Sequence, residues 1–288
     1  MCSTWPIPCT VQKAFNLAIK QDLPVQAAPP VAETSLAPAT PDATSEALTR
    51  EPPAATSEPA PPPPPSTPPK GGEPSARAVK RPIQVVILDP GHGGVDTGCE
   101  GEGGLKESQV VLNIAVKVRN ALEGGPVKVL LTREKDNEMA RAERAAFASK
   151  NKGDLYIAIH LGAGLSQTGH GIEAFCYDPE QSASQAASAE TKAVERPGKD
   201  YAEPSMAAAK VLIESVAAAA GQDVRGVHQA PCAILNDIDM PGLILETGYI
   251  GNPPEESLLL TNEHQDKIAN GVAQGVKKLA AESGGAKP

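Results

Sequence analysis

The stretch 83–94 constrains the fold more than any other part of the chain, and it reads IQVVILDPGHGG. Five of its first six residues are apolar and most are β-branched, as in a strand that is buried on both faces of a sheet. Pro90 and Gly91 then end the strand, because proline has no N–H for the ladder and glycine suits a turn. His92 therefore follows a buried strand at its carboxyl end, where open α/β sheets place their ligands. The alternative is that His92 faces solvent from an ordinary glycine-rich loop.

Downstream of this stretch, short apolar runs alternate with segments in which apolar residues recur with a helical period. The expected strands are 127–131, 154–160, 171–177, 224–229, 233–235 and 243–245. The expected helices are 105–122, 139–150, 205–220, 254–260 and 264–281. Ser205 is the expected N-cap of the third helix, and Gly221 follows its end. The alternation predicts an α/β fold with a mostly parallel twisted sheet and helices on both faces.

Composition divides the 288-residue chain into a tail and one folded domain. Seventeen of the 29 prolines lie within residues 24–82. Such a segment buries too little apolar area to offset its ordering entropy, so it is expected to be a disordered, Pro-rich linker. Residues 1–23 form a short segment of unknown role, without the basic and long apolar regions of a secretory signal. Residues 83–288 are long enough for one core and are expected to form the catalytic domain.

Charge and cysteine usage exclude some classes of function. The formal net charge of −9 and the aromatic content of 3% argue against nucleic-acid binding, which needs a basic surface and often stacking platforms. No apolar run approaches the ~20 residues that span a bilayer. The five cysteines contain no CxxC pair, so they predict neither a disulfide framework nor a thiolate zinc site. Cys176 and Cys232 are expected to be buried thiols.

Three metal-capable side chains lie where the predicted sheet brings strand ends together. His92 follows one strand, His160 ends another, and Glu107 lies in the first turn of the helix after the glycine loop. Glu246 follows the buried run 243–245, so it belongs to the same edge of the sheet. Two neutral imidazoles and one carboxylate leave a coordination position open, as in catalytic zinc sites. These residues predict a metal site with Glu246 beside it.

The position of Glu246 allows two interpretations. A carboxylate after a buried strand is costly to bury unless it has a function or a partner. Next to a metal-bound water, it could accept a proton and pass it to a leaving group. Alternatively, it caps a turn or pairs with an arginine such as Arg133 or Arg144. The wide spacing of the four polar residues does not decide between these interpretations.

A series of short motifs runs in order through the folded part. The motifs are ILDPGHGG at 87–94, KES at 106–108, LTR at 131–133, Arg144, IH at 159–160, GIE at 171–173 and LETGYIGN at 245–252. Together they resemble the zinc-dependent N-acetylmuramoyl-L-alanine amidases of the Amidase_3 family, over about residues 83–282. The resemblance implies that His92, Glu107 and His160 bind zinc and that Glu246 is the catalytic carboxylate.

The resemblance also implies a reaction. The substrate would be the amide between the lactyl group of N-acetylmuramic acid and L-alanine of the peptidoglycan stem, cleaved in cell-wall turnover or cell separation. Zinc would activate a water and polarise the carbonyl, while Glu246 takes the proton and returns it to the alanine nitrogen. Peptidoglycan is the implied partner, an activator protein is a candidate second partner, and the implied location is periplasmic or extracellular.

Several positions have no settled role. Family members usually carry Asn or Asp two residues after the second histidine, where this chain has Gly162, so the support of the site is in question. Glu173 either lines the substrate groove or makes a structural pair. Segment 178–204 lies where some relatives carry a helix that plugs the active site, but its low complexity favours a solvated loop. No role in the site is expected for His170, His228 and His264.

Two other functions remain compatible with the sequence. One is a catalytically impaired peptidoglycan-binding or regulatory module on the same fold, although the intact set of four residues argues against it. The other is a zinc hydrolase that acts on a different amide, which the fold alone does not exclude.

Overall fold

The computed structural model describes residues 82–163, 168–178 and 201–284. The predicted N-terminal segment 1–23 and nearly all of the predicted linker 24–82 lie outside the described residues. So does most of segment 178–204, and the solvated loop that we expect there stays a prediction. The described residues hold the part of the chain in which the motifs occur.

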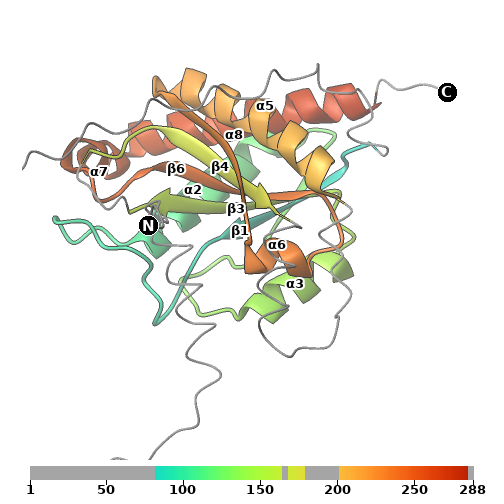
Figure 1. The fold of residues 1–288 in the computed structure, drawn as a ribbon, viewed down its shortest axis with the longest axis horizontal. Coiled ribbons are helices and arrows are strands. Elements are labelled where there is room, and N and C mark those ends of the chain that lie inside the picture. The colour runs from blue at the N-terminus through green and yellow to red at the C-terminus, as the bar shows by residue number, and fades with distance from the viewer. Residues whose placement is uncertain (1–81, 164–167, 179–200, 285–288) are drawn as a thin grey trace, which may run out of the picture. The chain divides into compact units, whose positions relative to one another are not determined.

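One sheet organises the described residues (Figure 1). Its six strands are β1 (Val85–Pro90), β2 (Lys128–Leu131), β3 (Leu155–Gly162), β4 (Ile172–Tyr177), β5 (Val224–Ala230) and β6 (Gly242–Tyr249). The helices are α2 (Glu107–Leu122), α3 (Arg141–Lys150), α5 (Ala202–Ala220), α6 (Ala233–Asp237), α7 (Pro253–Leu259) and α8 (Asn262–Gly284). The strand order is β2-β1-β3-β6-β4-β5.

The sheet is mostly parallel. Every neighbouring pair is parallel except β4 and β6, which are antiparallel. Helices lie on both of its faces, with α5 and α8 side by side on one face and α3 and α6 on the other (Figure 1). The predicted fold class is therefore confirmed.

Strand β3 shows how the two faces are assigned. All of its residues are buried, and successive side chains point to opposite faces. Ile157 and Ile159 pack into the larger core cluster, which includes residues of α2, α5 and α8. Tyr156 and Ala158 pack into the smaller cluster, which includes residues of α3 and α6. His160 continues the second series, so its imidazole belongs to the face that α3 and α6 cover.

Two local predictions were wrong. Residues 233–235 were expected to form a strand, but they belong to helix α6, because a three-residue apolar run has no distinguishable period. Ser205 was expected to cap α5, but the helix begins earlier and the Ser205 hydroxyl accepts a hydrogen bond from Gly242 N at 2.9 Å. The predicted role of Gly221 is confirmed, since it adopts a left-handed conformation at the C-cap.

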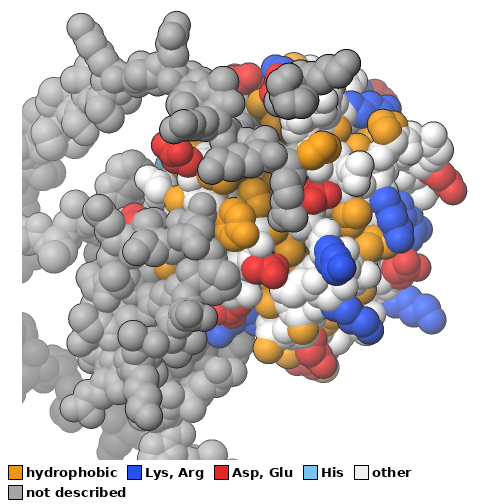
Figure 2. Space-filling view, turned by 90° about the vertical axis from the view of Figure 1, so that its right-hand side faces the viewer, with side chains coloured by type: hydrophobic (Ala, Val, Ile, Leu, Met, Phe, Trp, Pro, Cys, Tyr) orange, Lys and Arg blue, Asp and Glu red, His pale blue; other side chains and the backbone are white. Residues whose placement is uncertain are grey.

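The surface charges, the helices and the cysteines can be compared with what the composition predicts. On the face seen in Figure 2, acidic and basic side chains are mixed with hydrophobic ones. No helix of the described part combines the length and apolarity needed to cross a membrane. Cys176 and Cys232 are buried free thiols as expected. The side chain of Cys99 is buried as well.

Two arginines hold the backbone at the carboxyl end of β1. Arg144 donates to the Asp89 carboxylate at 2.5 Å and to the carbonyls of Pro90 and His92 at 2.9 and 2.7 Å. Arg133 donates to the carbonyls of Pro90 and Gly91 at 3.0 and 2.7 Å. Both side chains are buried, so this arginine clamp satisfies three consecutive carbonyls that the sheet leaves unpaired.

The clamp predicts a large stability loss for Arg144→Gln. The substitution removes the cationic partner of the buried Asp89 carboxylate, so we expect the free energy of unfolding to fall by about 3 kcal/mol. Urea unfolding of the purified protein measures this loss. The matched control is Arg141→Gln on the same helix, whose exposed side chain pairs with Asp237, and its expected change is within about 0.5 kcal/mol. Equal losses in the two variants would contradict the clamp.

Candidate metal centre

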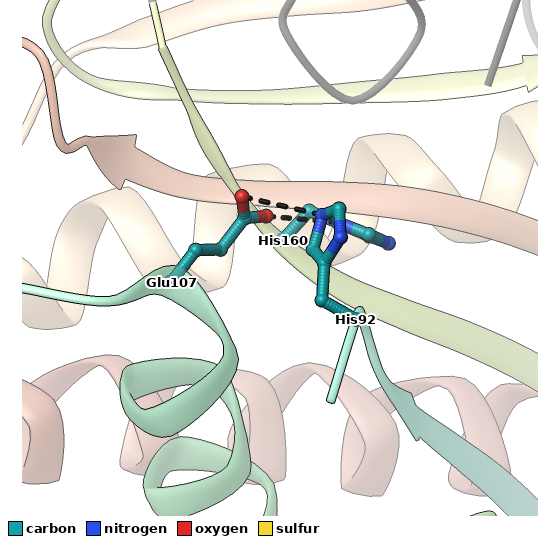
Figure 3. Close-up of side chains that lie close together, drawn as sticks. All are labelled: His92, Glu107 and His160. Atoms are coloured by element: carbon teal, nitrogen blue, oxygen red, sulfur yellow. Dashed lines mark hydrogen bonds and ion pairs between the residues drawn. The ribbon is translucent and has the colours of Figure 1, made fainter. Parts of the chain in front are cut away.

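Three side chains from separate elements converge at the carboxyl ends of β1 and β3. His92 follows β1, Glu107 begins α2 and His160 lies on β3 (Figure 3). One ligand-capable atom of each lies within 4.8 Å of the others, and the described residues contain no second group of this kind. The sequence prediction that these three residues meet is therefore confirmed.

Glu107 contacts both histidines, whose rings lie edge to face with centroids 5.0 Å apart (Figure 3). Its Oε1 is 2.9 Å from His160 Nδ1, and its Oε2 is 3.3 Å from His92 Nε2. Oε2 also accepts a hydrogen bond from Cys99 N at 2.9 Å. The carboxylate is completely buried. Burial alone would raise its pKa, but the hydrogen bonds and charges of His160 and His92 hold the pKa well below the usual range.

His92 is oriented by Asp96 as well as by its backbone. Its Nδ1 lies 2.7 Å from Asp96 Oδ2, which leaves Nε2 directed toward Glu107. The residue has φ of 57°, a left-handed conformation that a non-glycine residue adopts at a cost. Burial would lower the pKa of His92, but the Asp96 and Glu107 carboxylates outweigh burial and raise the pKa to about 9. For His160 burial dominates and lowers the pKa.

Glycines allow the three side chains to approach one another. A Cβ at Gly91 would lie 2.1 Å from His160 Cε1, so no side chain fits between the turn and the imidazole. A Cβ at Gly98 would lie 2.6 Å from Glu107 Oε2, and Gly98 also has φ of 74°. The glycines of the loop are therefore required by the close packing of the three side chains.

Glu246 lies next to this group on the neighbouring strand. The β3–β6 register pairs His160 directly with Glu246, so both side chains are on the same face of the sheet. Glu246 is completely buried, and neither carboxylate oxygen has a hydrogen-bond partner among the described residues. Burial raises the pKa of Glu246 well above its usual value, and the Glu107 and Glu173 charges add to the effect. Arg133 and Arg144 bind β1 instead, so the alternative of an arginine pair for Glu246 is excluded.

Glu173 continues the same row of side chains. It pairs in register with Glu246 across β4 and β6. Its carboxylate accepts a hydrogen bond from the Tyr249 hydroxyl and lies 3.3 Å from His228 Nε2. Burial opposes ionisation of Glu173, but the contacts with His228, Tyr249 and Arg225 lower its pKa. Sequence reasoning missed the contact of His228, because only the β4–β5 pairing brings the two residues together.

The remaining histidines lie outside this group. His170 Nε2 is 3.3 Å from Asp223 in an exposed pair. A hydrogen bond with the backbone carbonyl of Thr168 raises the pKa of His170. His264 is buried near the start of α8, where burial lowers its pKa. Neither belongs to the group of metal-capable residues.

Gly162 has a clear structural role despite the departure from the family pattern. A Cβ at Gly162 would lie 2.7 Å from the Tyr249 ring, and a Cβ at Gly169 would also lie 2.7 Å from it. The Tyr249 ring therefore occupies the space into which a side chain at position 162 would extend. Position 162 has no side chain here, and the ring of Tyr249, which carries a hydroxyl, fills the space instead.

Several proteins named N-acetylmuramoyl-L-alanine amidases are similar to this chain. The N-acetylmuramoyl-L-alanine amidase family model Amidase_3 matches residues 86–278. The chain is 32% identical over 216 residues to the N-acetylmuramoyl-L-alanine amidase AmiA of Escherichia coli K12, covering 67% of this chain and 75% of AmiA.

Solved structures agree with this assignment. The catalytic domain of CwlV, an N-acetylmuramoyl-L-alanine amidase of Bacillus (Paenibacillus) polymyxa var. colistinus, is similar with a TM-score of 0.57 and 27% identity, over 68% of this chain and 97% of CwlV. The CwlD amidase of Clostridioides difficile, solved with the GerS lipoprotein, has the same fold at a TM-score of 0.55 and 24% identity, over 69% of this chain and 98% of CwlD. The family match and the identity to AmiA together show that this chain belongs to the N-acetylmuramoyl-L-alanine amidase family Amidase_3.

Proposed function

We propose that the protein is a zinc-dependent hydrolase that cleaves the amide between N-acetylmuramic acid and L-alanine of the peptidoglycan stem, in cell-wall turnover or cell separation. The observation that carries this proposal is the pairing of a compact His92–Glu107–His160 group with a buried Glu246 that has no hydrogen-bond partner in the described residues. A buried carboxylate without a partner is costly, which favours a functional role for Glu246.

The three side chains fit a zinc ion. Two imidazoles and one carboxylate are a ligand set of catalytic zinc sites, in which a fourth position stays open. His92 Nε2 is buried and faces Glu107 Oε2 at 3.3 Å, so it points into the group as a metal-ligating nitrogen would. The Asp96 contact with His92 Nδ1 is the carboxylate–histidine arrangement that orients metal ligands. When bound, zinc would lower the pKa of a water to about 7 and polarise the scissile carbonyl.

Glu246 is the residue that we assign to proton transfer. It faces the group from the adjacent strand, in register with His160. Burial raises the pKa of Glu246, and a raised pKa means that its carboxylate has a high affinity for a proton, as a general base requires. We infer that a Glu246 carboxylate oxygen takes the proton of the attacking water and then delivers it to the alanine nitrogen as the amide bond breaks.

Two other proposals concern the setting of the protein. The substrate of this family is the cell wall, so we propose a periplasmic or extracellular location. Peptidoglycan is the proposed macromolecular partner. An activator protein is the second proposed partner, by analogy with the complex of CwlD and the GerS lipoprotein.

The first test measures metal content together with cleavage of purified peptidoglycan. We expect about one zinc per chain, release of stem peptide with a new L-alanine amine, loss of release after chelation and recovery after zinc is added back. Bound zinc without cleavage would favour the impaired binding module. Cleavage that resists complete metal removal would contradict the proposed mechanism.

Glu246→Gln should abolish turnover while the metal stays bound. The amide keeps the size of the side chain but cannot accept the proton, so we expect kcat to fall by at least about 100-fold with unchanged zinc content. Peptide release and metal analysis on the same sample measure both quantities. The matched control is Glu263→Gln, an exposed residue of α8 paired with Lys267, which should keep wild-type turnover. Normal kcat in Glu246→Gln would exclude the assigned role.

Metal affinity should rise with pH up to about 9. The pKa of His92 in the metal-free fold is raised from 6.5 to about 9, so protonated His92 stabilises this fold below 6.5 and the stabilisation is lost as the pH rises through 9. A metal ion must displace that proton, and we expect the apparent zinc affinity to increase about tenfold per pH unit between 7 and 9. Competition with a chelator of known affinity at several pH values measures the slope.

Asp96→Asn is the control for this pH dependence. The substitution removes a carboxylate that raises the pKa of His92, so the slope between pH 7 and 9 should become shallower. It also weakens the orientation of His92, so affinity at pH 9 should fall by roughly 10–100-fold. A wild-type affinity that is flat over this range would contradict the coupling between His92 and the metal.

A further inference from the structure

Beyond the metal group, a row of polar side chains crosses the sheet to its edge. His160 on β3, Glu246 on β6 and Glu173 on β4 are aligned by strand register and share one face. Arg225 and His228 on the edge strand β5 extend the row, since both contact Glu173. The proposed reaction uses the first two residues of this row and leaves the last three without a function.

Arg225 is held from three sides. Its Nε lies 3.6 Å from Glu173 Oε2, and its Nη1 donates to the His170 carbonyl at 3.4 Å. Its Cζ lies 5.0 Å from the centre of the Tyr249 ring, within the range of a cation–π contact. These contacts fix the guanidinium group before any ligand arrives, which lowers the entropy cost of binding through it.

The residues beneath Arg225 are specific to this arrangement. The Tyr249 ring lies where Gly162 and Gly169 leave space, and its hydroxyl donates to Glu173. Gly162, which departs from the family pattern, thus makes room for the aromatic platform that supports Arg225. The Tyr249 ring therefore contacts both β3, at Gly162, and Arg225 on the edge strand β5.

The exposed charge of this cluster is positive. The Arg225 side chain is 40% exposed, whereas that of Glu173 is 7% exposed and lies beneath it. The polar contacts of Arg225 with described residues involve Nε and Nη1, so Nη2 is the arm of the guanidinium group that can face a ligand. A planar, fixed guanidinium group with a free donor recognises carboxylates.

We propose that Arg225, supported by Tyr249 and Glu173, recognises a carboxylate on the stem peptide of the substrate. This inference rests on the proposed amidase function. On the glycan side, the lactyl carboxyl is consumed in the amide bond to the alanine nitrogen, so no free carboxylate remains there. A carboxylate that Arg225 binds must therefore belong to the peptide. Strand β5 is two strands from β6, about 10 Å from Glu246, and an extended peptide covers about 3.4 Å per residue. The recognised carboxylate therefore belongs to the second or third residue of the stem.

The test uses two matched pairs of synthetic muramoyl peptides. The members of one pair differ only in a carboxylate or carboxamide on the second stem residue, and those of the other pair only on the third. We expect the wild-type protein to prefer the carboxylate member of one pair by about tenfold in kcat/KM. In Arg225→Gln this ratio should fall to about one, through KM rather than kcat. Arg225→Lys, which keeps the charge but not the planar fork, should give an intermediate ratio.

Two controls separate binding from folding. Arg141→Gln removes an exposed arginine of α3 and should keep the wild-type ratio. Tyr249→Phe removes the hydroxyl but keeps the ring under Arg225, so most of the preference should remain. An unchanged ratio in Arg225→Gln, or equal losses on both members of each pair, would overturn the inference.

The outcome for the wild-type protein separates this inference from the proposed function. Cleavage of both members of each pair without preference overturns the role of Arg225 alone. No cleavage of any member would overturn the amidase proposal and this inference with it.

Discussion

The capture of three consecutive carbonyls by two buried arginines is the interaction on which the candidate site depends. Strand β1 ends at Pro90, and its next carbonyls would be buried without partners if Arg133 and Arg144 were absent. The clamp also neutralises Asp89 at the end of the strand. Because these contacts fix the turn, His92 can be held in a left-handed conformation that it would not keep in a loose loop.

The site also depends on two buried carboxylates, Glu107 and Glu246, that have different surroundings. Glu107 is buried against two imidazoles, and its contacts with both of them hold the three groups together. Glu246 is buried beside them without a partner among the described residues, so it keeps its proton affinity. One carboxylate is therefore suited to a metal ion and the other to a proton, although they have the same chemistry in water.

Sheet register extends the row of polar side chains from the candidate site to the edge of the sheet. The antiparallel pairing of β4 with β6 places Glu173 opposite Glu246, and the parallel pairing of β4 with β5 brings Arg225 and His228 to Glu173. The edge strand thus places Arg225 and His228 beside the acidic side chains of β4 and β6. A small residue at position 162 and an aromatic residue at position 249 are coupled by the space that they share.

The sequence by itself determined the layout of β1, the mostly parallel sheet and the identity of the residues that meet at its edge. Buried strands and amphipathic helices have local periods, and polar residues at the ends of parallel strands converge by geometry. Local patterns failed where they were short, as in residues 233–235, which form α6.

Only the tertiary structure decided which distant residues are partners. Tyr249 and Glu173 are 76 positions apart, and Arg144 and Asp89 are 55 apart, so their pairing depends on how the strands and helices pack. The sequence left Arg133 and Arg144 open as partners of Glu246, and the packing assigns them to β1. Likewise, the absence of a side chain at Gly162 is explained only when the Tyr249 ring is seen to fill its place. A local sequence pattern does not predict the space that a residue far along the chain will occupy.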